Sequence, residues 1–123
     1  MTGVQTCALP IYMQQQLASG KSLEEVYTPY IEQLPQNVYL SIDIDGLEPL
    51  NCPNTGTPVP GGLRYGELEH LIFMLVKSGR NIIGFDLCEV GDSVDGWDAN
   101  VGSRILYQLC GALLASQGKI NYK

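Results

Sequence analysis

The sequence predicts an α/β fold with a parallel sheet. Residues 38–42 and 81–87 are short and mainly apolar, as buried strands are. Segments with helical periodicity, over 23–34, 66–78 and 101–114, alternate with them. This order is typical of parallel strands joined by helical crossovers, and 123 residues suffice for one domain with a modest core.

The first helix has a clear beginning. Ser22 and Glu25 have the spacing of a capping box, which predicts a helix from Leu23. Pro29 lacks a backbone N–H, so we expect it to break or restart that helix. A turn over 35–37 then leads into the first strand.

A segment dense in proline and glycine, residues 46–63, follows the first strand. Regular structure does not persist through so many breakers, so we expect a long ordered loop. Such loops inside compact domains are usually functional.

Two further helices are expected around the second strand. An amphipathic helix over 66–78 would end at Gly79, directly before the strand. The last helix, which Gly118 would stop, carries its apolar residues on one face: Val101, Ile105, Leu106, Leu109, Leu113 and Leu114.

Charge and composition exclude several kinds of partner. With 7 basic and 13 acidic side chains, the chain has a net charge of −6 and offers no basic face to a nucleic acid. Its longest apolar run, residues 71–76, is too short to span a bilayer, and no secretory signal is visible. We therefore expect a cytoplasmic protein with no nucleic-acid and no membrane partner.

The cysteines and the one histidine do not predict a metal site. Cys7, Cys52, Cys88 and Cys110 form no C-x-x-C pair, so we expect reduced thiols and no zinc. His70 is interpreted as a partly exposed residue of the helix over 66–78, not as a ligand.

An acidic pair ends the first strand. Asp43 and Asp45 stand two residues apart, so on a strand both carboxylates point to the same side. Two adjacent carboxylates repel unless a cation neutralises them, and Mn²⁺ or Mg²⁺ suits carboxylate oxygen. The alternative is a turn or N-cap pair without a ligand, because Asp-x-Asp-Gly is also good turn chemistry.

A second acidic cluster follows the second strand. Asp86 and Glu89 would face the same crevice beyond the strand ends and could hold a cationic group of a substrate. A solvated acidic loop with helix N-caps is the alternative, and it fits Asp92 and Asp98 better. An unpaired charge at Asp86, inside an apolar strand, would be costly.

One family resemblance is to the haloacid dehalogenase superfamily. Its members begin with a strand ending in Asp-x-Asp-Gly, and Gly91-Asp-Ser93 with Asp95 resembles a later acidic motif. This would imply a phosphotransferase with Asp43 as nucleophile and Asp45 as general acid. Leu47 stands where that family has threonine, and residues 50–63 have no place in its pattern. A non-catalytic α/β remnant is a further alternative.

A closer resemblance is to the ureohydrolase family of arginases, agmatinases and formimidoglutamases. It rests on Ser41-Ile-Asp-Ile-Asp-Gly-Leu-Glu-Pro49, on Pro53-Asn-Thr-Gly-Thr-Pro-Val-Pro-Gly-Gly-Leu63 and on Gly84-Phe-Asp-Leu-Cys-Glu-Val90, in family order. It extends over residues 22–118, and Glu48 stands where the family has aspartate. The segment from Glu89 to Arg104 resembles agmatinases more than arginases.

The ureohydrolase resemblance implies a site and a reaction. Asp43 and Asp45 would bind a pair of Mn²⁺ ions, while Glu89 and Thr57 would bind the substrate. Water activated by the metals would hydrolyse a guanidino group, of agmatine or arginine, to urea and an amine. Family members are usually homo-oligomers.

The same resemblance implies that part of the machinery lies elsewhere. Residues 12–123 match the C-terminal portion of a single ureohydrolase domain, whose fold is a three-layer α/β/α arrangement. The other metal ligands and the proton-shuttle histidine precede this portion, so we expect no catalytic residue here and no activity from this chain alone. Residues 1–11 resemble a translated sequencing adapter and are interpreted as an artefact.

Overall fold

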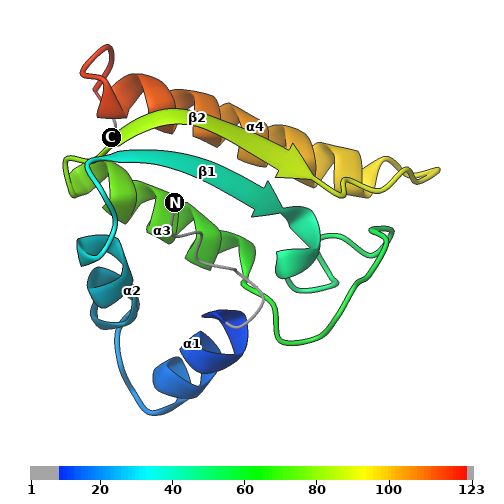
Figure 1. Cartoon of the computed structure of the whole chain (residues 1–123). Helices are drawn as coiled ribbons and strands as arrows, with labels where there is room; N and C mark the ends of the chain where they lie inside the picture. The colour runs from blue at the N-terminus through cyan, green and yellow to red at the C-terminus, as the bar shows by residue number, and fades with distance from the viewer. Residues whose placement is uncertain (1–8, 122–123) are drawn as a thin grey trace.

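Two parallel strands and four α-helices make up residues 9–121, the part of the chain that the computed structural model describes, with side chains from Met13 onward (Figure 1). Residues 1–8, which hold Cys7 and most of the adapter-like segment, lie outside the described residues. No described helix is long and apolar enough to cross a membrane. The elements are α1 (Leu9–Ala18), α2 (Leu23–Glu32), β1 (Asn37–Asp43), a 3₁₀ turn (Ile44–Gly46), α3 (Tyr65–Lys77), β2 (Asn81–Cys88) and α4 (Trp97–Ser116).

The two strands pair in parallel, so their carboxyl ends lie at the same edge. Ser41 is opposite Asp86 and Asp43 is opposite Cys88, with a shift of register between Val38 and Tyr39. The α/β class and the parallel sheet predicted from the sequence are therefore confirmed.

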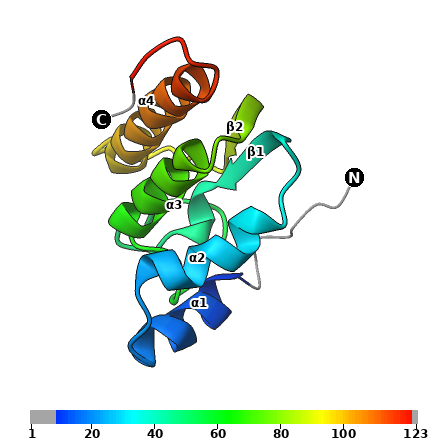
Figure 2. The ribbon, with the colours of Figure 1, turned by 90° about the vertical axis from the view of Figure 1, so that its left-hand side faces the viewer.

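One face of this sheet is covered by helices. In Figure 1, α3 and α4 lie behind the strands, and Figure 2 shows α3 between α4 and α2. Alternating strand residues, such as Val38 and Ile82, enter the core on this side. The opposite face is open in the described part of the chain, where the side chain of Tyr39 is 58% exposed.

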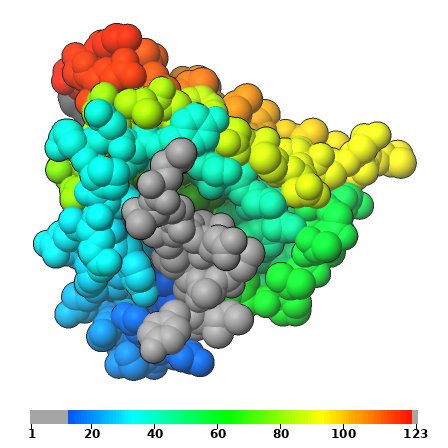
Figure 3. Space-filling view, viewed as in Figure 1, coloured from blue at the N-terminus to red at the C-terminus, as the bar shows by residue number. Residues whose placement is uncertain are grey.

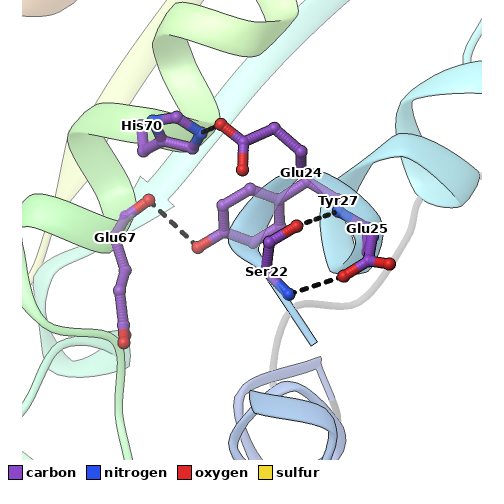
Figure 4. A network of polar contacts seen from close by, with 6 residues as sticks. All are labelled: Ser22, Glu24, Glu25, Tyr27, Glu67 and His70. Atoms are coloured by element: carbon purple, nitrogen blue, oxygen red, sulfur yellow. Dashed lines mark hydrogen bonds and ion pairs between the residues drawn. The ribbon is translucent and has the colours of Figure 1, made fainter. Parts of the chain in front are cut away.

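The capping box at the start of α2 is confirmed (Figure 4). The Glu25 N–H donates to Ser22 Oγ at 3.2 Å, and the Ser22 N–H donates to Glu25 Oε2 at 2.8 Å. Two backbone donors that the helix itself cannot satisfy are thereby paired.

Polar contacts fasten α2 to α3. The buried hydroxyl of Tyr27 donates to the carbonyl of Glu67 at 3.0 Å, and burial raises the pKa of this tyrosine (Figure 4). His70 Nε2 lies 2.9 Å from Glu24 Oε1, and its side chain is 28% exposed. The interpretation of His70 as a partly exposed helix residue is therefore confirmed.

The expected break at Pro29 is wrong, because α2 runs without interruption from Leu23 to Glu32. Val26, Tyr27 and Ile31, on both sides of the proline, are buried in the core. Tertiary packing of this face outweighs the missing backbone hydrogen bond, which a local signal cannot anticipate.

The apolar face predicted for the last helix is too wide. Val101, Ile105 and Leu109 are buried, whereas Leu106 is 45% and Leu114 is 37% exposed. Leu106 directly follows Ile105, and one residue turns a helix by about 100°, which moves its side chain out of the core.

We expect Pro29→Ala to stabilise the chain. Pro29 is exposed, so its replacement removes no packing and restores a backbone donor inside α2. The free energy of unfolding should rise by about 1–3 kcal/mol in urea denaturation. Pro58→Ala, in the exposed loop, is the control and should lower it by about 0.4–1 kcal/mol. A loss of stability in Pro29→Ala would contradict this account of α2.

Candidate active site

Acidic side chains gather where the two strands end. Asp43 is the last residue of β1, and its carboxylate accepts a hydrogen bond from the Asp45 N–H at 3.4 Å. Asp45 belongs to the 3₁₀ turn, so the predicted strand alternation is wrong for this pair. A turn capped by Asp43, rather than an extended strand, brings the two residues together.

The charges in this cluster influence one another. Partial removal from water raises the pKa of Asp43, the Asp45 N–H opposes this, and the negative charges of Asp45 and Glu89 add to the increase. The Asp43 carboxyl therefore lies in a site that is rich in negative charge and favours a cation.

Thr57 and Glu89 join the same cluster from two different loops. The Thr57 hydroxyl donates to Asp45 Oδ2 at 2.5 Å. Glu89 follows β2, and its carboxylate lies over Gly56, where an added Cβ would be 3.1 Å from Glu89 Oε2. The structure thus brings together the four residues that the sequence analysis selected.

The loop between β1 and α3 is ordered by contacts along its length. Its ends are held by a bridge between Leu47 and Leu63, with the Leu63 N–H donating to the Gly46 carbonyl at 2.9 Å. In its middle, the Trp97 indole N–H of α4 donates to the Leu50 carbonyl at 3.0 Å. The prediction of a long ordered loop is confirmed.

Cys52 anchors this loop from inside. Its side chain has no exposed surface, and its thiol donates to the Ile44 carbonyl at 3.1 Å. Burial, and then the nearby charges of Asp98, Asp45 and Asp43, raise the pKa of this thiol to about 11. Cys52, Cys88 and Cys110 are all free thiols, as the sequence predicted.

Asp98 is a functional candidate that sequence reasoning missed. It was expected in a solvated loop or as an N-cap, yet in the first turn of α4 it has no exposed surface. Its carboxylate accepts two hydrogen bonds from Asn54, from the backbone N–H and from Nδ2, both at 3.0 Å. Neither residue type is unusual at its position, so the sequence contains no signal for this pairing.

A hydrogen bond connects the loop to the backbone of Glu89, which has an uncommon conformation. The buried Thr55 hydroxyl donates to the Glu89 carbonyl at 2.8 Å. Glu89 has a φ of 60°, the one positive φ found for a non-glycine residue in the described part of the chain. Such a conformation is uncommon for a residue with a side chain and persists where its surroundings fix it.

Other acidic residues stay outside the cluster. Asp86 lies on the open face of the sheet, where it accepts from Ser41 Oγ at 2.8 Å, and this bond lowers its pKa. The charge of Asp86 is therefore paired with a hydrogen-bond donor, and the expected cost of an unpaired charge does not apply. Asp95 accepts from the Trp97 N–H at 3.1 Å at the start of α4, which is a capping role. The loop that carries it projects beyond the rest of the chain in Figure 3.

Two carboxylates of the cluster have oxygens that could bind a metal ion. Asp43 and Asp45 offer hard carboxylate oxygens of the kind that Mn²⁺ prefers. Among the described residues, no group of three or more His, Cys, Asp or Glu side chains is placed to hold a metal ion.

Comparison with known proteins identifies a family. Residues 4–111 match the model of the arginase family. The chain is 45% identical over 75 residues to an agmatinase of Halalkalibacterium halodurans, covering 58% of this chain and 26% of that protein. It is 39% identical over 90 residues to an N(1)-aminopropylagmatine ureohydrolase of Thermococcus kodakarensis, covering 72% of this chain and 31% of that protein.

Solved structures show the same relationship. The proclavaminate amidino hydrolase of Streptomyces clavuligerus superposes with a TM-score of 0.68 at 29% identity, covering 80% of this chain and 33% of that structure. The arginase of Bacillus caldovelox gives a TM-score of 0.58 at 31% identity, covering 84% and 33%. The chain has the arginase fold over about a third of the length of these relatives.

A substitution at Gly91 tests the close contact between the loop that follows β2 and the loop that follows β1. A Cβ at Gly91 would lie 2.1 Å from the backbone oxygen of Asn54, so Gly91→Ala must push the loops apart. We expect a loss of about 1–3 kcal/mol in thermal unfolding. Gly66→Ala is the matched control, since an added Cβ there meets no atom within 4 Å and the exchange in α3 should stabilise by about 0.5–1 kcal/mol. Equal effects at the two sites would contradict the packing described.

Proposed function

This chain belongs to the arginase family, and we propose that its acidic cluster is part of an active site that hydrolyses a guanidino group to urea and an amine. The observation that carries the proposal is the meeting of Asp43, Asp45, Thr57 and Glu89 where two adjacent parallel strands end. In open α/β sheets this is the edge where ligands bind. The family match also favours this function over phosphoryl transfer.

The activity is proposed for a longer protein that includes this chain. The chain spans 26–31% of the length of its first two curated relatives, and the metal ligands that we propose in it are two, Asp43 and Asp45. We therefore propose that the 123 residues are inactive alone. A homo-oligomeric assembly and a cytoplasmic location stay predictions.

We propose agmatine, or a similar guanidino compound, as the substrate. Two of the relatives named above act, by their names, on agmatine or an aminopropyl derivative of it. A guanidinium group is planar and positively charged, and a carboxylate can accept two parallel hydrogen bonds from it. Glu89 is the residue we assign to this contact, because its carboxylate is held at the cluster with no basic side chain recorded as its partner among the described residues.

The cofactor belongs to the proposal as well. Asp43 and Asp45 would hold manganese, because carboxylate oxygens suit this ion and the two residues lie close together. Divalent metals at such sites make water acidic enough to act as a nucleophile at neutral pH. The further ligands of two ions would come from outside the described residues.

The roles of this chain's residues follow from their contacts. Glu89 would bind and orient the guanidinium, which places the carbon to be attacked next to the metal-binding edge. The Thr57 hydroxyl holds one oxygen of Asp45 and so fixes the orientation of that carboxylate. The hydroxyl oxygen of Thr57 can still accept a hydrogen bond from an N–H of the substrate.

A chimera tests the proposed activity. We expect urea release from agmatine, dependent on Mn²⁺, when this chain replaces the matched segment of the H. halodurans agmatinase. The separate 123-residue chain should release none, and Asp43→Ala should abolish release by the chimera. A folded, manganese-loaded chimera without urea release would contradict the function. Metal-dependent release by the chain alone, lost in Asp43→Ala, would contradict its inactivity.

Two substitutions in the chimera separate the roles of the site residues. Glu89→Gln removes the charge that faces the guanidinium and should raise the KM for agmatine by about 10- to 100-fold. Thr57→Val should lower kcat/KM by about tenfold because Asp45 loses its hydrogen bond. Asp92→Asn removes an exposed charge nearby and serves as the control. Kinetics of Glu89→Gln that match the control would refute its assignment.

A further inference from the structure

Four successive loop residues, 54–57, each contact a different part of the site. Asn54 binds Asp98, and Thr55 binds the carbonyl of Glu89. Gly56 lies under the Glu89 carboxylate, and Thr57 binds Asp45. Any displacement at the first residue of this segment is therefore passed to the other three, since each is one peptide unit from the next.

Asp98 fixes the first residue of the segment. A carboxylate without exposed surface has to be compensated by hydrogen bonds inside the protein. Both hydrogen bonds that the structure records for Asp98 come from Asn54, one from its backbone and one from its side chain. Two bonds to one residue fix both its position and its orientation. We call this pair, Asp98 with Asn54, the Asp98 clamp.

The clamp also bears on the backbone at Glu89. Gly91 approaches the peptide after Asn54 so closely that an added Cβ would lie 2.4 Å from the Asn54 carbonyl carbon. Thr55, whose side chain is 6% exposed, holds the Glu89 carbonyl. The backbone around Glu89, which has a left-handed conformation, is thus in contact with Asn54, which belongs to the clamp, and with Thr55, which follows it.

We propose that Asp98 is a positioning residue, which acts through Asn54 and Thr55 to keep Glu89 in its left-handed conformation and its carboxylate over Gly56. The significance of that orientation rests on the proposed function, in which Glu89 binds a guanidinium. The clamp itself is a statement about conformation and can be tested without activity. A purely local role for Asp98, favouring the start of α4, predicts no change at Glu89.

An exchange of side chains separates the two roles. Asp98→Ala removes both acceptors, so both hydrogen bonds from Asn54 are lost. The double variant, Asn54→Asp with Asp98→Asn, moves the carboxylate to position 54 and the amide to position 98. Both hydrogen bonds can then form with the same net charge. Asp92→Asn, which removes a charge from an exposed position in the loop between β2 and α4, is the matched control.

The measurements use the whole 123-residue chain. The three-bond coupling between the amide and α protons of Glu89 reports its φ by NMR, and a titration with methylguanidinium reports binding at its carboxylate. We expect Asp98→Ala to change the coupling and to weaken methylguanidinium binding by about tenfold, about 1.4 kcal/mol. The double variant should restore both values, and Asp92→Asn should change neither.

A folded Asp98→Ala chain with an unchanged Glu89 coupling would overturn the proposal, as would a double variant that restores stability but not the coupling. If Asp98→Ala does not fold, Thr55→Val gives the same decision, because it removes the one hydroxyl that holds the Glu89 carbonyl. If the unaltered chain binds no methylguanidinium while the coupling responds as expected, the positioning role stands. The guanidinium role of Glu89 is then what has failed.

Discussion

The carboxylate of Asp98 has no exposed surface, so it needs hydrogen bonds from inside the protein. The geometry of the site around it depends on how these hydrogen bonds are made. Asn54 supplies two hydrogen bonds, and in doing so it holds a proline- and glycine-rich loop that has no regular structure of its own. Thr55 and Thr57 follow within three residues and reach Glu89 and Asp45. The geometry of the candidate active site is therefore set by a charge that lies outside it.

Parallel pairing supplies the second requirement. Asp43 ends β1 and Glu89 follows β2, so the register that places Asp43 opposite Cys88 brings both acidic residues to one edge. Helices α3 and α4 hold the strands from one side only, and the polar residues of the other face stay open in the described chain. The acidic cluster thus lies at one edge of the sheet, while the open face beside it is uncovered in the described part of the chain.

Family membership explains why this arrangement is recognisable although incomplete. The chain covers 33% of the Streptomyces clavuligerus structure, yet superposes on it with a TM-score of 0.68. The chain holds two carboxylates that suit a metal ion and one, of Glu89, that suits a cationic group. What the described residues lack is a third metal ligand beside Asp43 and Asp45. Partial removal from water raises the pKa of Asp43, and the nearby charges of Asp45 and Glu89 add to the increase.

The sequence by itself determined the features that act over a few residues or through a repeating pattern. These include the α/β class, the parallel strands, the capping box at Ser22, the ordered loop and the four candidate site residues. Tertiary structure alone decided that α2 continues through Pro29, that Asp45 meets Asp43 through a turn and that Asp98 is buried. Asn54 and Asp98 are 44 residues apart. Their hydrogen bonds depend on how α4 packs against the sheet, and no local signal encodes that packing.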